Sequence, residues 1–266
     1  MSLLLNTDLE RKVNQKVKGR IARVGGTVNQ LLLYKNCTVD DLNVADGGYG
    51  SGNALFKMRK CIQEEIRFLR RGWKIPRARK TILLDMHKAY KQEALFSKYD
   101  AIVSSNVIEH SPNPIWLLLN FHFLAKPGGY QYHAIPNYRY TYDMYRKPTL
   151  VEHMIEDFEK LTNEADKVHN EDYIQSAIEK HGNRREFHKK HPVAYPNMHF
   201  HVFDETNTRE LFEFMFEDVE NDVIRTEEFG DNVVLCRNTL RPGFIKEFGG
   251  VMSKYLGEGH ALLNRH

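Results

Sequence analysis

The feature that most constrains this chain is an alternation of short apolar runs with helical patterns between residues 20 and 135. Over Asn53–Arg71, for example, apolar residues recur at spacings of three and four, which is the period of one helical face. Short strands that alternate with helices predict a parallel sheet with helices on both faces. We expect strands over residues 20–24, 39–46, 81–85, 100–105 and 130–135, and helices over residues 7–19, 53–71, 87–96 and 114–124.

Two features follow this alternation. Between residues 137 and 203 the chain is rich in charge, His and Tyr, and we interpret this stretch as a mainly helical cap inserted into the sheet. After it, two apolar runs are separated only by a short turn at Gly230-Asp231, so they should form an antiparallel hairpin. The elements expected here are helices over residues 149–161, 170–180 and 206–216, and strands over residues 222–228 and 232–237.

A length of 266 residues suits one α/β domain with a sizeable insertion. The predicted organisation is an α/β core with an N-terminal helix over residues 1–136, the cap over 137–203, the last helix and hairpin of the core over 204–240, and a C-terminal tail over 241–266.

Composition excludes several classes of protein. The net charge of +3, from 38 Lys and Arg against 35 Asp and Glu, is too small to indicate binding of duplex nucleic acid. No apolar run approaches the ~20 residues of a membrane span. The three Cys are far apart and form no CxxC pair, which argues against a disulfide framework or a Cys-rich zinc site. We therefore expect a cytoplasmic protein without a membrane span.

The most specific segment runs from Tyr99 to Ile135. A strand over Tyr99–Ile102 leads into Asn106-Val107-Ile108-Glu109-His110, and an apolar helix ends in Leu124-Ala125-Lys126-Pro127-Gly128-Gly129 before the next strand. This segment resembles the class I S-adenosylmethionine (SAM)-dependent methyltransferases. The resemblance implies a Rossmann-like fold, with a doubly wound, mostly parallel seven-stranded sheet that ends in an antiparallel hairpin. It also implies SAM as cofactor, bound near the strand end at Ser105 and Asn106.

The resemblance extends into the cap. The run from Pro136 to Asp143, continued by Arg146, Thr149 and His153, is similar to a motif in methyltransferases encoded with bacterial surface-polysaccharide genes. The segment His199–Phe203 fits the same subgroup. The implied activity is O-methylation of a sugar, a nucleotide sugar or a phosphate-modified sugar. The implied partner is a small-molecule or glycan acceptor. The sequence itself does not decide the oligomeric state, for which a homodimer is one expectation, and its small net charge argues against a nucleic-acid partner.

Two glycine segments compete as the loop that approaches the methionine part of SAM. Gly25-Gly26 is a reduced form of the family's glycine loop, whereas Gly47–Gly52 matches its glycine pattern literally. We favour the first, because strand two then ends at Asp46, an acid suited to the ribose hydroxyls. Strand three then ends at Asp85, which can accept from the adenine amino group, with Met86 beside it. Asp40 and Asp41 compete with Asp46, and we interpret them as strand-start or turn acids.

Histidines gather where the acceptor should bind. A hydroxyl acceptor benefits from a base of near-neutral pKa, and His110 follows the strand that ends at Ser105. We expect His110 and His201 to face one acceptor from opposite sides, with the rate rising with pH through the pKa of the base. His199 and His201, with Asp204, could instead hold a divalent metal, but we expect no metal site.

Two other functions were weighed against methyl transfer. A short-chain dehydrogenase needs a Tyr-x-x-x-Lys pair, and none of the thirteen Tyr has Lys four residues later. A catalytically weak SAM-binding relative that serves as a scaffold is the alternative that the reduced glycine loop motivates.

Overall fold

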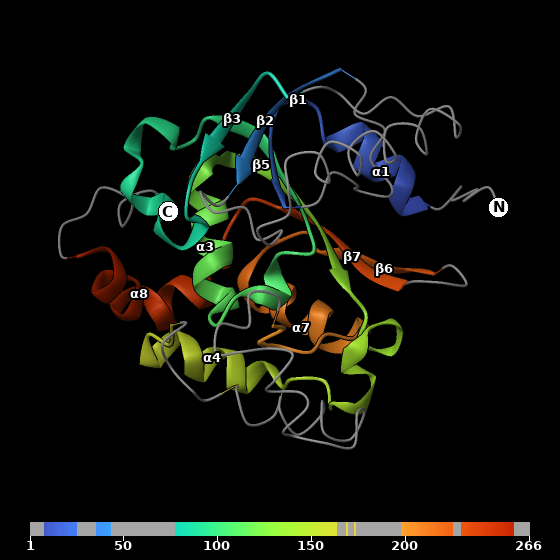
Figure 1. The fold of residues 1–266 in the computed structure, drawn as a ribbon. Helices are drawn as coiled ribbons and strands as arrows, with labels where there is room; N and C mark the ends of the chain where they lie inside the picture. The colour runs from blue at the N-terminus through green and yellow to red at the C-terminus, as the bar shows by residue number, and fades with distance from the viewer. Residues whose placement is uncertain are drawn as a thin grey trace, which may run out of the picture.

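The computed structural model describes residues 8–25, 36–43, 78–163, 169, 173, 198–225 and 230–257. Seven strands form one sheet in the order β3-β2-β1-β4-β5-β7-β6 (Figure 1). Their bounds are β1 Gly19–Gly25, β2 Cys37–Asn43, β3 Lys80–Leu83, β4 Tyr99–Ser105, β5 Ala125–Pro136, β6 Glu220–Arg225 and β7 Gly230–Arg237.

The pairing directions confirm the predicted fold class. Strands β3, β2, β1, β4 and β5 run parallel to one another, and β7 pairs antiparallel with both β5 and β6. The result is a doubly wound, mostly parallel sheet that ends in an antiparallel hairpin. In this order β1 lies beside the central strand β4, so Gly25 stands at the carboxyl end of β1, next to the end of β4.

Helices cover the two faces unequally in the described residues. Leu9 and Val13 of α1 pack against one face, and α3, α4, α7 and α8 lie on the other (Figure 1). The bounds are α1 Asp8–Lys16, α3 Pro114–Leu124, α4 Val151–Lys160, α7 Glu205–Met215 and α8 Pro242–Leu256. Among the described helices, none is long and apolar enough to span a membrane. The helix predicted over residues 53–71 lies outside the described residues, as does all of 170–180 except Tyr173.

The sequence of helix α3 has no polar face because the helix is buried on all sides. The side chain of Asn113 caps it by accepting from the backbone N–H of Trp116 at 3.0 Å, and Pro114 occupies the first turn. Ten of its eleven residues are buried, because the sheet lies on one side and α4 and α8 on the other. A helix that is apolar all round is a buried one.

Two elements differ from the prediction. Residues 87–96 form two short 3-10 helices, η1 Met86–Lys91 and η2 Glu93–Leu95, rather than one α-helix. The stretch predicted as a tail contains α8, whose Phe244 and Phe248 are buried in the core. Four turns of helix are hard to predict there, because Gly243, Gly249 and Gly250 weaken the helical propensity.

Ion pairs fix the register between β1 and β2. Arg20 contacts Asp40 at 2.6 Å, and Arg23 binds Asp41 with two hydrogen bonds of 2.6 and 3.0 Å. Asp40 is 1% exposed, so its charge depends on these partners. Asp40 and Asp41 therefore lie inside β2 as partners of arginines, and not at a strand start or turn as the sequence suggested.

We predict that Gly25→Ala destabilises the protein. Gly25 has φ of +80°, and an added Cβ would lie beside Val107 and 2.6 Å from the carbonyl oxygen of Ser105. Strain of this kind costs ~2 kcal/mol, which lowers the melting temperature by about 4–8 °C. The measurement is thermal unfolding followed by circular dichroism.

Gly250→Ala is the matched control. An added Cβ at Gly250 meets no atom within 4 Å, and the residue lies inside α8. Replacement there should leave stability unchanged or raise it by up to ~1 kcal/mol. Equal melting temperatures for Gly25→Ala and the wild type would contradict the close approach of the β1 and β4 ends.

Candidate active site

The carboxyl ends of β1 and β4 form the first side of the candidate site. Gly25 pairs with Ser105, and Asn106 follows with a positive φ of 54° that turns the chain out of the sheet. The backbone N–H of Asn106 donates to the carbonyl of Ala134 at 3.1 Å, which holds this turn against β5. Ligands of open α/β sheets bind at these strand ends. The hydroxyl of Ser105 and the amide of Asn106 thus stand where the sequence placed cofactor contacts.

The end of β3 supplies an acid and an apolar residue. One oxygen of Asp85 accepts the backbone N–H of His87 at 3.0 Å, and the other lies 2.9 Å from the ammonium of Lys88. Partial burial opposes ionisation, but hydrogen bonds from Lys88 and the His87 backbone lower the pKa of Asp85 below its ordinary value. The side chain remains 42% exposed, so this carboxylate can still accept from a ligand. Met86 beside it is buried.

Two of the predicted cofactor residues cannot be placed. Gly26 and Asp46 lie outside the described residues, as does the competing loop Gly47–Gly52. The strand order nevertheless agrees with the frame in which Gly25 ends strand one. The contacts of this loop with SAM stay a prediction.

His110 lies at the turn that follows β4. It belongs to a 3-10 helix, η3 Ile108–His110, and its Nδ1 lies 2.9 Å from the carbonyl oxygen of Met198. A carbonyl only accepts, so the proton is on Nδ1 and Nε2 keeps its lone pair. Burial lowers the pKa of His110 to about 4, and the neighbouring ring of His199 acts in the same direction. The side chain is 34% exposed and can therefore be reached by an acceptor.

A buried ionic group supports His110 from the cap. The ring of His199 meets that of His110 edge to face, with centroids 4.8 Å apart. Asp143 accepts from Nδ1 of His199 at 2.5 Å, and Arg146 donates to Asp143 at 2.8 Å and to the carbonyl of His199 at 2.7 Å. Sequence reasoning did not assign a role to Asp143 or Arg146. The only signal was their place in the motif that follows Pro136.

Glu109 precedes His110 and has an unusual environment. Its side chain is 1% exposed, and neither carboxyl oxygen has a hydrogen-bond partner among the described residues. Burial raises the pKa of Glu109 well above its ordinary value, and the charges of Asp231 and Asp143 add to this effect. Burial therefore works against a negative charge on Glu109 beside His110.

The structure does not bring His201 to the same place as His110. His201 is fully buried, its Nδ1 lies 3.0 Å from the carbonyl oxygen of Ser111, and its Nε2 lies 2.9 Å from Asp157. Both ring nitrogens are therefore engaged, which does not favour the role of base. The structure also does not bring together His199, His201 and Asp204, the alternative metal ligands. His199 bonds Asp143 instead. Asp204 caps α7 by accepting from the N–H groups of Thr206 and Asn207.

The fold and this site define a Rossmann-like methyltransferase that uses SAM. The chain belongs to the methyltransferase domain family, whose model matches residues 18–214. It is a SAM-dependent methyltransferase, of the enzyme class EC 2.1.1. No curated protein matches the chain.

Several solved structures are similar to the chain at low identity. One comes from work on the conversion of a disulfide bond into a thioacetal group during echinomycin biosynthesis, with 11% identity, TM-score 0.42, and 93% of this chain and 87% of that chain covered. An arsenic(III) SAM methyltransferase from Chlamydomonas reinhardtii has 12% identity and TM-score 0.41, covering 86% and 66%. The trans-methyltransferase CalH in complex with SAH has 16% identity and TM-score 0.40, covering 86% and 53%. The chain thus spans between half and two thirds of the last two proteins.

The described residues fit SAM as a ligand. The β1 end accepts only glycine at position 25, and the exposed carboxylate of Asp85 can accept from an amino group. We predict that Asp85→Ala weakens SAM binding by about 1.5–3 kcal/mol, the cost of leaving a polar group of the ligand unpaired. Isothermal titration calorimetry with SAM measures this as a roughly 10- to 150-fold rise in Kd.

Glu93→Ala is the control, because it removes an exposed carboxylate from the next 3-10 helix. SAM should bind this variant as it binds the wild type. If Asp85→Ala also binds SAM normally, Asp85 is only the cap of η1, and the adenine site must lie elsewhere.

Proposed function

We propose that this methyltransferase transfers the methyl group to a hydroxyl of a sugar, a nucleotide sugar or a phosphate-modified sugar used in surface glycan biosynthesis. The observation that carries the O-methyl part is His110, a partly exposed ring with an unprotonated Nε2 at the end of β4. The sugar part is supported by the resemblance of residues 136–153 and 199–203 to the polysaccharide-associated subgroup.

Gly25, Asp85, Met86, Ser105 and Asn106 are the described residues that would hold the cofactor. When bound, SAM supplies a methyl group on a sulfonium sulfur, which an acceptor oxygen can displace. His110 takes the hydroxyl proton on Nε2 while its Nδ1–H stays bonded to the Met198 carbonyl. The proton gives the His110 ring a positive charge. This ring contacts the ring of His199, which in turn bonds the carboxylate of Asp143. His199 thus positions His110, and Arg146 fixes Asp143.

The acceptor side is formed by the start of the cap. Tyr138 belongs to η4 Tyr138–Tyr140, and Tyr145 ends η5 Tyr142–Tyr145 with half of its surface exposed. Tyrosine faces stack on sugar rings and leave a hydroxyl for hydrogen bonding. Arg139 lies over the ring of Tyr138 and pairs with Glu205 at 2.6 Å, which places a cation beside this aromatic surface. A phosphate on the acceptor would suit that cation.

The acceptor class is tested with SAM that carries a labelled methyl group. The enzyme is incubated with free, phosphorylated and nucleotide-linked hexoses, and the products are analysed by mass spectrometry. Label in an O-methyl sugar supports the proposal. Turnover of amine, thiol or carbon acceptors, with none of the sugars labelled, would contradict it.

We predict that His110→Gln lowers turnover by at least about 100-fold, because a positioned base contributes ~10²- to 10⁴-fold. SAM affinity should change little, since the base acts only on the acceptor. His122→Gln is the control, because His122 lies on α3 and bonds Asn238. Steady-state kinetics gives kcat and calorimetry gives the Kd of SAM. Near-normal kcat for His110→Gln would indicate an acceptor that ionises without a base, such as a phosphate or carboxylate.

The pH dependence of kcat gives a separate prediction. His110 faces His199 and Glu109 and lies near Asp143, and burial lowers its pKa to about 4. The ring is therefore neutral, and able to accept a proton, at every pH above that value. We expect kcat to stay level from about pH 5.5 to 8 and to fall only as the pH drops toward the pKa. A rise centred near pH 6.5 would show that His110 titrates like an exposed histidine, or that another base acts.

A further inference from the structure

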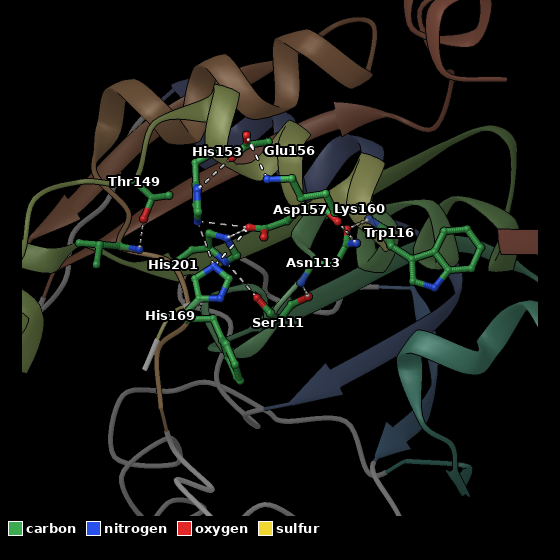
Figure 2. Close-up of polar contacts among 12 residues, drawn as sticks. Ser111, Asn113, Trp116, Thr149, His153, Glu156, Asp157, Lys160, His169 and His201 are labelled. Carbon is green, nitrogen blue, oxygen red and sulfur yellow. Dashed lines mark hydrogen bonds and ion pairs between the residues drawn. The ribbon is translucent and has the colours of Figure 1, made fainter. Parts of the chain in front are cut away.

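A second group of ionisable side chains lies apart from His110. It consists of His153 and Asp157 on α4, together with His169 and His201, and we call it the α4 cluster. Figure 2 shows the three histidine rings around the carboxylate of Asp157. One ring nitrogen of each histidine and one oxygen of Asp157 all lie within 4.8 Å of one another.

The distances within the cluster are those of ligands around one ion. The Oδ2 atom of Asp157 lies 2.9 Å from Nε2 of His201, 3.2 Å from Nε2 of His169 and 3.5 Å from Nε2 of His153. The Nε2 atoms of His153 and His169 are 3.1 Å apart. The corners of a tetrahedron about 2.0 Å from a central zinc ion are about 3.3 Å apart. Three imidazole nitrogens and one carboxylate oxygen are also a donor set that zinc accepts.

The ring of His201 lies between two oxygens that can only accept. The carbonyl oxygen of Ser111 lies 3.0 Å from Nδ1, and the carboxylate of Asp157 lies 2.9 Å from Nε2. A neutral ring has one proton, so only one of these contacts can be a hydrogen bond, and a cation bound to Nε2 would take the place of the other. An N–H of a ligating histidine that donates to a backbone carbonyl is the usual support of a metal site. His169 is held instead by ring contacts with Phe200 and His201.

Burial makes the cluster a closed site. Asp157, His169 and His201 are at most 4% exposed, and only His153 reaches the surface. A cation among them would separate the nitrogen and oxygen lone pairs that otherwise face one another. All four donors come from the protein, and such a complete set is typical of structural rather than catalytic zinc.

We propose that the α4 cluster is a structural zinc site, formed by His153, Asp157, His169 and His201. The ion would connect α4 with His169 and His201. Through the contact of His201 with the Ser111 carbonyl, it would also be linked to the turn that contains His110. This inference does not depend on the identity of the methyl acceptor.

The experiment measures metal in the full-length protein, purified without chelator or a metal-affinity column. Elemental analysis should find about one equivalent of zinc. Chelation should lower the melting temperature, and zinc should restore it. Cobalt added to the chelated protein should give the intense visible absorption of a tetrahedral cobalt ion, which a network of hydrogen bonds alone cannot produce.

Two variants and a control locate the ion. Asp157→Asn keeps the size of the side chain but removes the charge and replaces one acceptor oxygen with an NH₂ donor. His153→Gln alters the residue that is most exposed and least coupled to packing. Each should weaken zinc binding by more than about 100-fold in competition with a chromophoric chelator, since loss of even a partner of a ligand costs ~10- to 100-fold. His122→Gln should bind zinc as the wild type does.

Three results would overturn the proposal. One is folded wild-type protein that holds no stoichiometric zinc and gives no tetrahedral cobalt spectrum. Another is full zinc stoichiometry and affinity in both Asp157→Asn and His153→Gln. The third result is that variants of Glu109, His110 or His199 lose zinc while the α4 cluster variants keep it. That result would place the ion beside His110 instead. If a variant does not fold, the cobalt titration of the wild type still decides.

Discussion

The backbone of Glu109 joins the turn that follows β4 to residues 198–200, and the geometry of the candidate site depends on this contact. Its carbonyl oxygen accepts the N–H of Phe200 at 2.8 Å, while the neighbouring His110 bonds the carbonyl of Met198. These two contacts join residues that are far apart in the sequence. The proton position on His110, the approach of His199 and the burial of His201 all follow from this alignment. Residues 198–200 therefore pack directly against the turn that follows β4.

Charge inside the fold is used in two different ways. In the sheet, Arg20 and Arg23 neutralise Asp40 and Asp41 directly, so the acids serve the pairing of β1 with β2. In the cap, Asp143 faces both Arg146 and His199, and its negative charge reaches the turn that follows β4 only through a ring. The first arrangement stabilises structure and leaves no acid for a ligand. The second also pairs the acid with an arginine, Arg146, and its other carboxylate oxygen holds the ring of His199, which lies beside His110.

The fold was predicted well where a segment had both a periodic pattern of apolar residues and a Pro or Gly that marked its end. The bounds of α3 follow from Pro114 and from the end of the apolar run. The antiparallel hairpin was also predicted, but Gly230 and Asp231, which the sequence placed in its turn, lie inside β7 and pair with Arg225 and Ile224 of β6. The helix α8 was not predicted, because its glycines hide an apolar face that shows only when α3 and α4 pack against it.

The site was predicted in part. His110 could be placed from its strand, but the contact of His199 with Asp143 spans 56 positions and no local pattern encodes it. Likewise, His153 and Asp157 are one helical turn apart, while the folding of the cap brings His169 and His201 to them.

The aromatic end of α8 bears on how the chain folds during synthesis. Tyr255 stacks on Trp116 with ring centroids 4.1 Å apart and on Phe158 at 5.2 Å, and its hydroxyl bonds both Asn113 and the carbonyl of Phe158. Asn113 is the residue that caps α3, and Phe158 belongs to α4. A ribosome that has made every strand of the sheet has therefore not yet supplied the side chain that locks α3 to α4. The contacts that tie Trp116 and Asn113 to Phe158 through one aromatic ring can therefore form only after residue 255 has been made.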